Sequence, residues 1–155
     1  MEVIGDFGDI QDQAMIFSQA AHLTNGFTNL ADFQPLSACE FKSKTFKDLC
    51  FYGRGYLSLR GTKAYKKVSL GLNYGGKLIQ NPDRITEPDL AAKVAVWQWN
   101  NMLKPNAKDY RNNYLDIAKA VYGGNLKSTS WEARIPYKIY KNLCPILNLE
   151  PVQNK

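Results

Sequence analysis

The alternation of apolar and polar residues along the chain is typical of helices separated by irregular segments. In the first such segment, apolar residues recur at the spacing of one helix face: Ile10, Ala14, Phe17 and Ala21. Asn25-Gly26 follows this segment, and such a pair commonly ends a helix. The pattern therefore predicts a helix over about residues 10–24.

The segment 86–105 gives the clearest helical pattern in the chain. Thr86 can cap its start, Pro88 suits a first turn, and Pro105 stops the helix. Apolar residues line one face: Leu90, Ala91, Val94, Ala95 and Trp97. This face is predicted to pack in the core.

Three further segments predict shorter or broken helices: residues 62–70 up to Gly71, residues 108–124 up to Gly123-Gly124, and residues 131–149 with interruptions near Pro136 and Pro145. The segment 27–49 keeps no period and is predicted to be a long loop. Residues 56–60 fit either a short strand or an extended stretch. Because no repeat divides the sequence, we expect a single, mainly α domain over residues 1–155, with at most a small β element.

The composition is that of a globular chain, with 45% hydrophobic and 22% charged residues. No apolar run approaches the ~20 residues that a membrane-spanning helix needs. The N-terminal segment lacks the basic and apolar regions of a signal peptide. A net charge of +6 favours an anionic partner, but the basic residues are dispersed, so neither nucleic acid nor a membrane is an expected partner.

Three cysteines allow at most one disulfide within the chain. Cys39 and Cys50 are the candidate pair because they would close a short loop, and three buried free thiols, including Cys144, are the alternative. The single histidine, His22, and scattered cysteines cannot supply a zinc ligand set, so no metal or other cofactor is predicted. Gly53-Arg54-Gly55 lacks the spacing of a phosphate-binding loop.

Paired carboxylates remain as candidate chemistry. Glycoside hydrolysis needs one acid that protonates the leaving oxygen and a second that activates water. The candidates near the first helix are Asp9, Asp12, Asp32 and Glu40, and each of them alone is equally explained as a solvated surface acid.

Four segments, in order, resemble the family 19 glycoside hydrolases, the chitinases of plants and bacteria with phage and bacterial lysin relatives. They are MIFSQAAHLTNGF (15–27), YGRGYLSLRGTKAY (52–65), LIQNPDRITEPDLAAKVAVWQW (78–99) and ARIPYKIYKNLCPIL (133–147). Among the substrate-binding residues that the resemblance assigns, five are retained: His22, Tyr52, Arg54, Tyr65 and Arg134.

The resemblance implies a lysozyme-like helical fold in which two lobes flank a sugar-binding cleft. It implies a monomer whose partner is chitin or a peptidoglycan-type polysaccharide, and an extracellular or cell-wall-directed location without a signal peptide in this sequence. The family's first helices have no counterpart in the chain, so we expect a reduced version of the fold.

The resemblance fails at the catalytic residues. The family's general-acid glutamate follows the histidine, and here the residue after His22 is Leu23, which cannot donate a proton. The second carboxylate position, nine residues further, is Asp32, and Glu40 beside Cys39 is the alternative.

The family's polar contacts to sugar and water are also replaced. Ser58 stands for a glutamine, Arg60 for a water-holding serine or threonine, Ala64 for a substrate-binding asparagine, and Tyr122 for a second asparagine. These replacements predict a chitinase-like protein that is catalytically impaired or inactive and binds an N-acetylglucosamine polymer. Two alternatives stay open: an active chitinase or endolysin with Asp32 or Glu40 in a rearranged carboxylate pair, and a helical scaffold whose basic surface binds an acidic partner.

Overall fold

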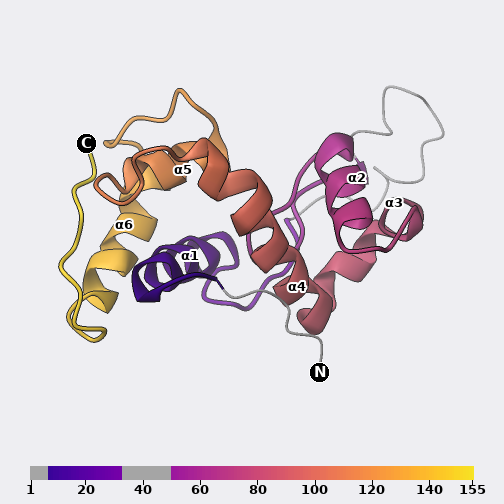
Figure 1. Cartoon of the computed structure of the whole chain (residues 1–155), viewed down its shortest axis with the longest axis horizontal. Helices are drawn as coiled ribbons and strands as arrows, with labels where there is room; N and C mark the ends of the chain where they lie inside the picture. Colours follow the sequence, from indigo (N-terminus) through magenta and orange to yellow (C-terminus); the bar gives the residue numbers. More distant parts are fainter. Residues whose placement is uncertain (1–6, 33–49) are drawn as a thin grey trace. The chain divides into compact units, whose positions relative to one another are not determined.

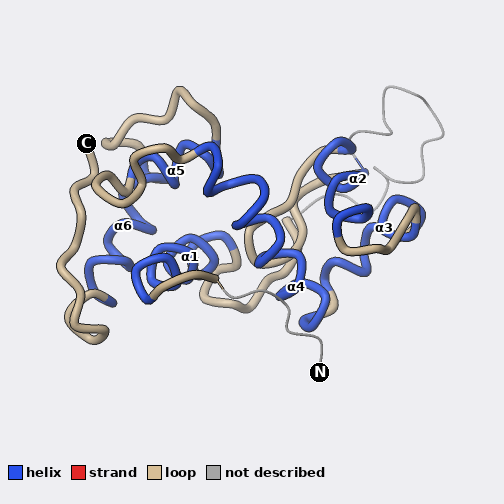
Figure 2. Tube along the Cα trace, viewed as in Figure 1, coloured by secondary structure: helices blue, strands red, loops and turns tan. Residues whose placement is uncertain are grey.

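The structure, a computed structural model, describes residues 7–32 and 50–155 (Figure 1). Six α-helices are formed: α1 (Ile10–Leu23), α2 (Thr62–Gly71), α3 (Lys77–Gln80), α4 (Pro88–Gln98), α5 (Leu115–Tyr122) and α6 (Trp131–Leu143). Shorter turns lie between them: the 3-10 helices η3 (Pro82–Thr86) and η5 (Lys104–Asn106), and the π-helical η4 (Trp99–Leu103). The prediction of a mainly α chain is confirmed (Figure 2).

The chain divides into two compact units, residues 1–22 with 99–155 and residues 23–98. The first unit contains α5, α6 and nearly all of α1, and the second contains α2, α3 and α4. Among the described residues, no helix is long and apolar enough to cross a membrane.

In the first unit, α1 buries Ala14 but not all of the apolar residues that define its spacing. Ile10 is 45% exposed and Phe17 is 49% exposed, whereas Met15, Ser18 and Gln19 are buried. The two polar side chains are tolerated because both reach the buried Tyr114 hydroxyl: Ser18 Oγ lies 2.6 Å from it, and Gln19 Nε2 donates to it at 3.1 Å. Apolar spacing alone cannot reveal a buried tyrosine that pairs with polar residues.

The clearest predicted helix is confirmed in its existence but differs at both ends. Thr86 does not cap α4, since its Oγ1 donates to the Asp83 carbonyl within η3 at 2.7 Å. At the other end, α4 gives way to the π-helical η4 after Gln98. Trp99 is therefore the fully buried tryptophan, whereas the predicted core residue Trp97 is half-buried.

The two C-terminal helices also differ from the prediction. The helix α5 covers only Leu115–Tyr122, because the residues before it form turns. The helix α6 continues through Pro136, which lies buried inside it, so the predicted interruption there was wrong. It ends at Leu143, before Pro145.

The predicted small β element is present in the second unit as paired extended segments without a full strand. Isolated antiparallel bridges join Ala31 to Arg54 and Arg54 to Leu59. Residues 58–60 return beside residues 53–55 through a turn in which the Ser58 amide donates to the Gly55 carbonyl at 3.2 Å. Residues 30–32, 53–55 and 58–60 thus lie side by side, and this arrangement positions the candidate site.

Candidate functional site

The second-carboxylate position, Asp32, lies in a small polar cluster on the paired segments. The Asp32 backbone amide donates to the Gly53 carbonyl at 2.8 Å. Arg60 Nη2 lies 2.7 Å from Asp32 Oδ2, and Arg60 Nε donates to Ser58 Oγ at 3.0 Å. We call Asp32, Gly53, Ser58 and Arg60 the Asp32 cluster. Two positions that depart from the family pattern, Ser58 and Arg60, therefore bind each other, and Arg60 also binds the carboxylate.

Gly53 makes the cluster possible because it has no side chain. A Cβ atom at Gly53 would overlap Ser58 Oγ and Asp32 Oδ2. The backbone of Gly53 consequently lies directly against both side chains. The solvent reaches the cluster from one side, since the side chain of Arg60 is 62% exposed and that of Asp32 is 28% exposed.

The general-acid position, Leu23, is the last residue of α1 and is half-buried. A turn follows in which the Thr24 carbonyl accepts from the Thr28 amide at 3.0 Å and from the Asn29 amide at 2.9 Å. Asn25 and Gly26 adopt φ values of 51° and 70°, so the predicted helix stop is confirmed. The turn holds position 23 at the helix end, but its aliphatic side chain carries no proton.

The other candidate carboxylates near α1 have structural partners. Asp9 Oδ1 accepts from the Gln11 and Asp12 backbone amides at 3.1 and 3.0 Å and caps the helix. The hydrogen bond from the Asp12 backbone amide lowers the pKa of Asp9 below its usual value, and a second hydrogen bond from Arg111 adds to this effect. Asp12 is fully buried and lies 2.9 Å from Lys104 Nζ and 3.2 Å from Arg111 Nη2. Both carboxylates therefore have structural roles near the start of α1: Asp9 caps the helix, and Asp12 forms ion pairs with Lys104 and Arg111.

Glu40, the alternative second carboxylate, lies outside the described residues, as does Cys39. Cys50 is disulfide-bonded, and Cys144 is a buried free thiol. The pairing of Cys39 with Cys50 stays a prediction. Among the four carboxylates considered from the sequence, Asp32 is the one in the described chain that lies against the glycine-rich segment, residues 53–61.

Three of the retained residues form a buried support beneath that segment, which we call the Arg54 support: Tyr52, Arg54 and Tyr65. Arg54 is 1% exposed and binds Asp83 through Nε and Nη2, at 2.9 and 2.7 Å. Its Nη1 donates to the Cys50 carbonyl at 2.8 Å and to the Tyr65 hydroxyl at 3.0 Å. Its guanidinium carbon lies 3.6 Å from the centre of the Tyr52 ring.

Within the Arg54 support, the guanidinium of Arg54 stays charged and the hydroxyl of Tyr65 stays protonated. Burial alone would disfavour the charged guanidinium, but hydrogen bonds to Tyr65 and Asp83 raise the pKa of Arg54 above its ordinary value. Burial raises the pKa of Tyr65 to about 12, and its hydroxyl donates to the Tyr52 carbonyl at 2.7 Å. The polar atoms of Arg54 and Tyr65 thus have internal partners, and their predicted contact with substrate stays a prediction.

His22 and Tyr122 come together in the first unit with a residue that the sequence did not single out. The His22 ring meets Trp131 edge-on, with ring centroids 5.5 Å apart and an interplanar angle of 82°. The Tyr122 ring lies 6.3 Å from His22. Partial burial lowers the pKa of His22, although Glu132 opposes the effect. A signal for Trp131 was present, since a tryptophan follows the polar run Lys127–Ser130 at a helix start.

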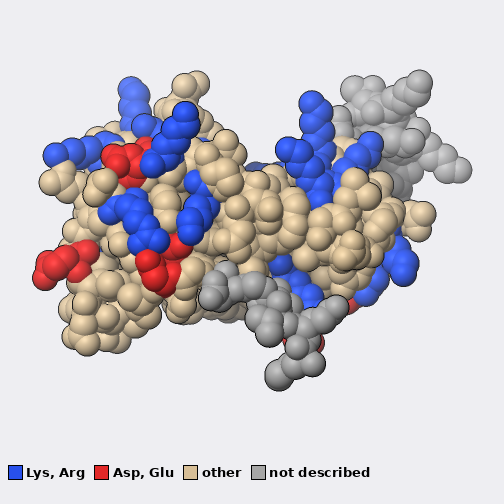
Figure 3. Space-filling model, in the orientation of Figure 1, with Lys and Arg blue, Asp and Glu red and all other residues tan. Residues whose placement is uncertain are grey.

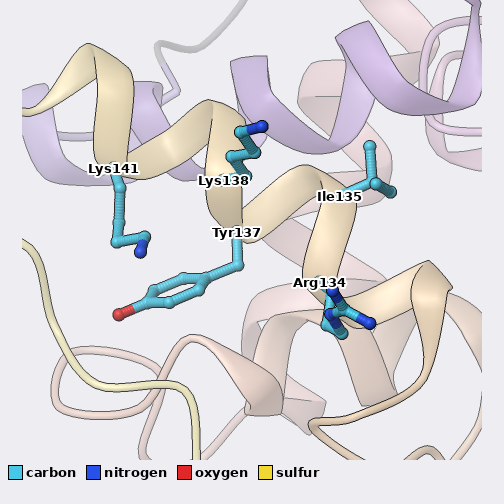
Figure 4. Close-up of a pocket in the computed structure, with 5 residues that line it drawn as sticks. All are labelled: Arg134, Ile135, Tyr137, Lys138 and Lys141. Atoms are coloured by element: carbon cyan, nitrogen blue, oxygen red, sulfur yellow. The ribbon is translucent and has the colours of Figure 1, made fainter.

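Arg134 lies on the exposed surface of α6 and contributes to an open groove with a volume of about 360 Å³. The other lining residues are Ile135, Tyr137, Lys138 and Lys141 (Figure 4). In the second unit, Lys and Arg side chains gather over α2 (Figure 3), where Lys63, Lys66 and Lys67 are exposed. Exposed basic residues therefore occur in both units, over α2 and along α6.

The chain resembles plant endochitinases in sequence. It is 29% identical to the acidic 26 kDa endochitinase of Solanum lycopersicum over 164 residues, which covers 91% of this chain and 63% of the relative. It is also 29% identical to an inactive endochitinase of Arabidopsis thaliana, with 86% and 50% of the two chains covered. The chain spans about half to just under two thirds of the length of these relatives. No protein-family model matches it.

The fold is that of solved chitinase structures. A family 19, class IV chitinase from Zea mays superposes with a TM-score of 0.70 at 19% identity, over 93% of this chain and 72% of that structure. The predicted resemblance is therefore confirmed: the chain is a relative of the endochitinases with the lysozyme-like fold of the family 19 chitinases, and leucine occupies the position of that family's general acid.

Proposed function

We propose that this protein binds an N-acetylglucosamine polymer of the chitin type and has lost most or all of the family's hydrolytic activity. The ion pair between Arg60 and Asp32, 2.7 Å long, is the observation that carries the proposal. It stands in addition to the leucine at position 23, so one step of the reaction lacks its group and a second has its carboxylate engaged in an ion pair.

The first missing step is protonation of the leaving oxygen. General acid catalysis contributes about 10²–10⁴-fold to such reactions. Leu23 has no proton to give, and the described carboxylates Asp9 and Asp12 are engaged at the other end of α1.

The second affected step is activation of water. A base for this step must accept a proton on a carboxylate oxygen that is within hydrogen-bond reach of the water. Oδ2 of Asp32 is bound by the Arg60 guanidinium, which occupies the position of the family's water-holding residue. The same arginine therefore stands in place of the group that would hold the water and competes for one oxygen of the carboxylate that would activate it.

We expect polymer binding to be retained although hydrolysis is lost, because the residues that support the site are in place. Nε and Nη1 of Arg54 donate to Asp83, to the Cys50 carbonyl and to the Tyr65 hydroxyl, and these bonds hold the backbone of the glycine-rich segment. The named relatives are endochitinases, which favours chitin over peptidoglycan as the polymer.

The test combines a binding assay with a set of restoration variants. Insoluble chitin and peptidoglycan are used as pull-down matrices, and hydrolysis of chitin oligosaccharides is measured for Leu23→Glu, for Leu23→Glu with Arg60→Ser, and for Leu70→Glu. Leu70 is 68% exposed in the same unit, so its variant controls for an added carboxylate. We expect chitin retention by the natural chain, no gain in hydrolysis for Leu70→Glu or Leu23→Glu alone, and a measurable gain for the double variant.

Two results would contradict the proposal separately. Hydrolysis by the natural chain at the rate of an active family member would overturn the loss of activity. Failure to bind either matrix would overturn the polymer-binding function.

A further inference from the structure

Trp131 is an aromatic side chain that remains largely exposed. It is the first residue of α6 and is 64% exposed, whereas Trp99 is fully buried and Trp97 is half-buried. Leaving much of an indole in water forgoes the favourable free energy of burying its apolar surface. An exposed tryptophan of this kind, when it is held in place, is a common anchor for a binding partner.

The indole is held in a defined orientation by its neighbours. The backbone at its base is fixed, because the Ala133 and Arg134 amides donate to the Ser130 carbonyl at 3.1 and 2.9 Å. The ring itself contacts His22 edge-on, and His22 is in turn backed by Tyr122. Trp131 therefore presents open ring surface without a large loss of side-chain entropy on binding.

The chemistry of this surface favours an uncharged ligand with a flat apolar face. His22 is partly buried beside the aromatic rings, and that burial favours its neutral form. A pyranose ring meets these requirements, because its axial C–H groups form an apolar face while its hydroxyl and acetamido groups project from the edge. N-acetylglucosamine is such a ring and carries no charge.

The surface is joined to the general-acid position through α1. His22 immediately precedes Leu23, the general-acid position, at the end of α1. We propose that Trp131, backed by His22 and Tyr122, is a stacking platform for one N-acetylglucosamine ring of the bound polymer. The proposal rests on the polymer-binding function proposed above and names a subsite for it.

The experiment is a titration of the full chain with chitin hexasaccharide, followed by tryptophan fluorescence and by acrylamide quenching. Trp131 is the most exposed of the three tryptophans, so quenching reports mainly on it. We expect the sugar to protect the fluorescence from acrylamide. Trp131→Ala should weaken binding roughly 10-fold or more, the scale of a lost base-on-aromatic stack. Trp131→Tyr, which keeps an aromatic face, should stay within about 3-fold of the natural chain.

The matched control is Ile146→Ala, since Ile146 is 75% exposed in the same unit but is not aromatic. Circular dichroism and thermal melting of each variant show that the fold is kept. If the natural chain binds the hexasaccharide but Trp131→Ala binds as tightly as Ile146→Ala, the platform is overturned and polymer binding stands. If the natural chain binds no hexasaccharide and no chitin, both are overturned. Binding without protection from acrylamide would also overturn the platform.

Discussion

The two arginines of the glycine-rich segment, Arg54 and Arg60, differ in almost every physical respect. Arg54 is buried and binds a carboxylate, a carbonyl, a hydroxyl and an aromatic ring. Arg60 is exposed and binds one carboxylate and one hydroxyl. The first matches the family pattern and the second departs from it. The difference supports the proposal that the residues which support the site have been kept, whereas those which would act on a substrate have been replaced.

The largest expected effect that tests this contrast is the loss of stability on replacing Arg54 with methionine. The variant leaves the Tyr65 hydroxyl and the Cys50 carbonyl without their donor, so the free energy of unfolding should fall by about 2–4 kcal/mol. Urea denaturation monitored by circular dichroism measures it. Arg60→Met is the matched control, and equal losses in the two variants would remove the distinction between support and surface.

A smaller effect is expected from removing one hydroxyl of the Arg54 support. Tyr65→Phe takes away the donor to the Tyr52 carbonyl and the acceptor for Arg54 Nη1, so we expect a loss of about 1–3 kcal/mol. Tyr52→Phe is the control, because its ring and not its hydroxyl contacts Arg54. Thermal unfolding of both variants decides the point, and a neutral Tyr65→Phe would show that the hydroxyl does not support the segment.

A further effect on stability is expected from the titration of His22, a retained residue in the first unit. Its pKa is lowered in the folded protein, so the unfolded chain binds a proton more readily than the folded chain between that value and about 6.5. Stability should therefore fall as the pH decreases through this range and should level off below it. Because His22 is the single histidine, NMR titration of its ring protons follows one group. A folded-state pKa above that of the unfolded chain would reverse the sign and contradict the prediction.

How much of this contrast the sequence could predict depends on the kind of interaction. Helix existence followed from apolar spacing and stop signals, as for the turn at Asn25-Gly26. The burial of Ser18 and Gln19 did not, because it depends on the Tyr114 hydroxyl, about a hundred residues away in the chain. The resemblance located Asp32 and Arg60 as altered positions, but their ion pair required residues 30–32 and 58–60 to lie on either side of residues 53–55.

The smallest expected effect on stability is that of Arg60→Ser, and it gives the sharpest test of the contrast. An exposed ion pair contributes about 0–1 kcal/mol, so the unfolding midpoint should hardly change. The same variant releases Asp32 Oδ2, so its consequence should lie in chemistry: Arg60→Ser should raise hydrolysis only when Leu23→Glu supplies the acid. Activity measured across the four combinations of these two changes gives their coupling. Independent effects would mean that Arg60 does not hold the second carboxylate, and the kept support would then surround a site that was lost through position 23 alone.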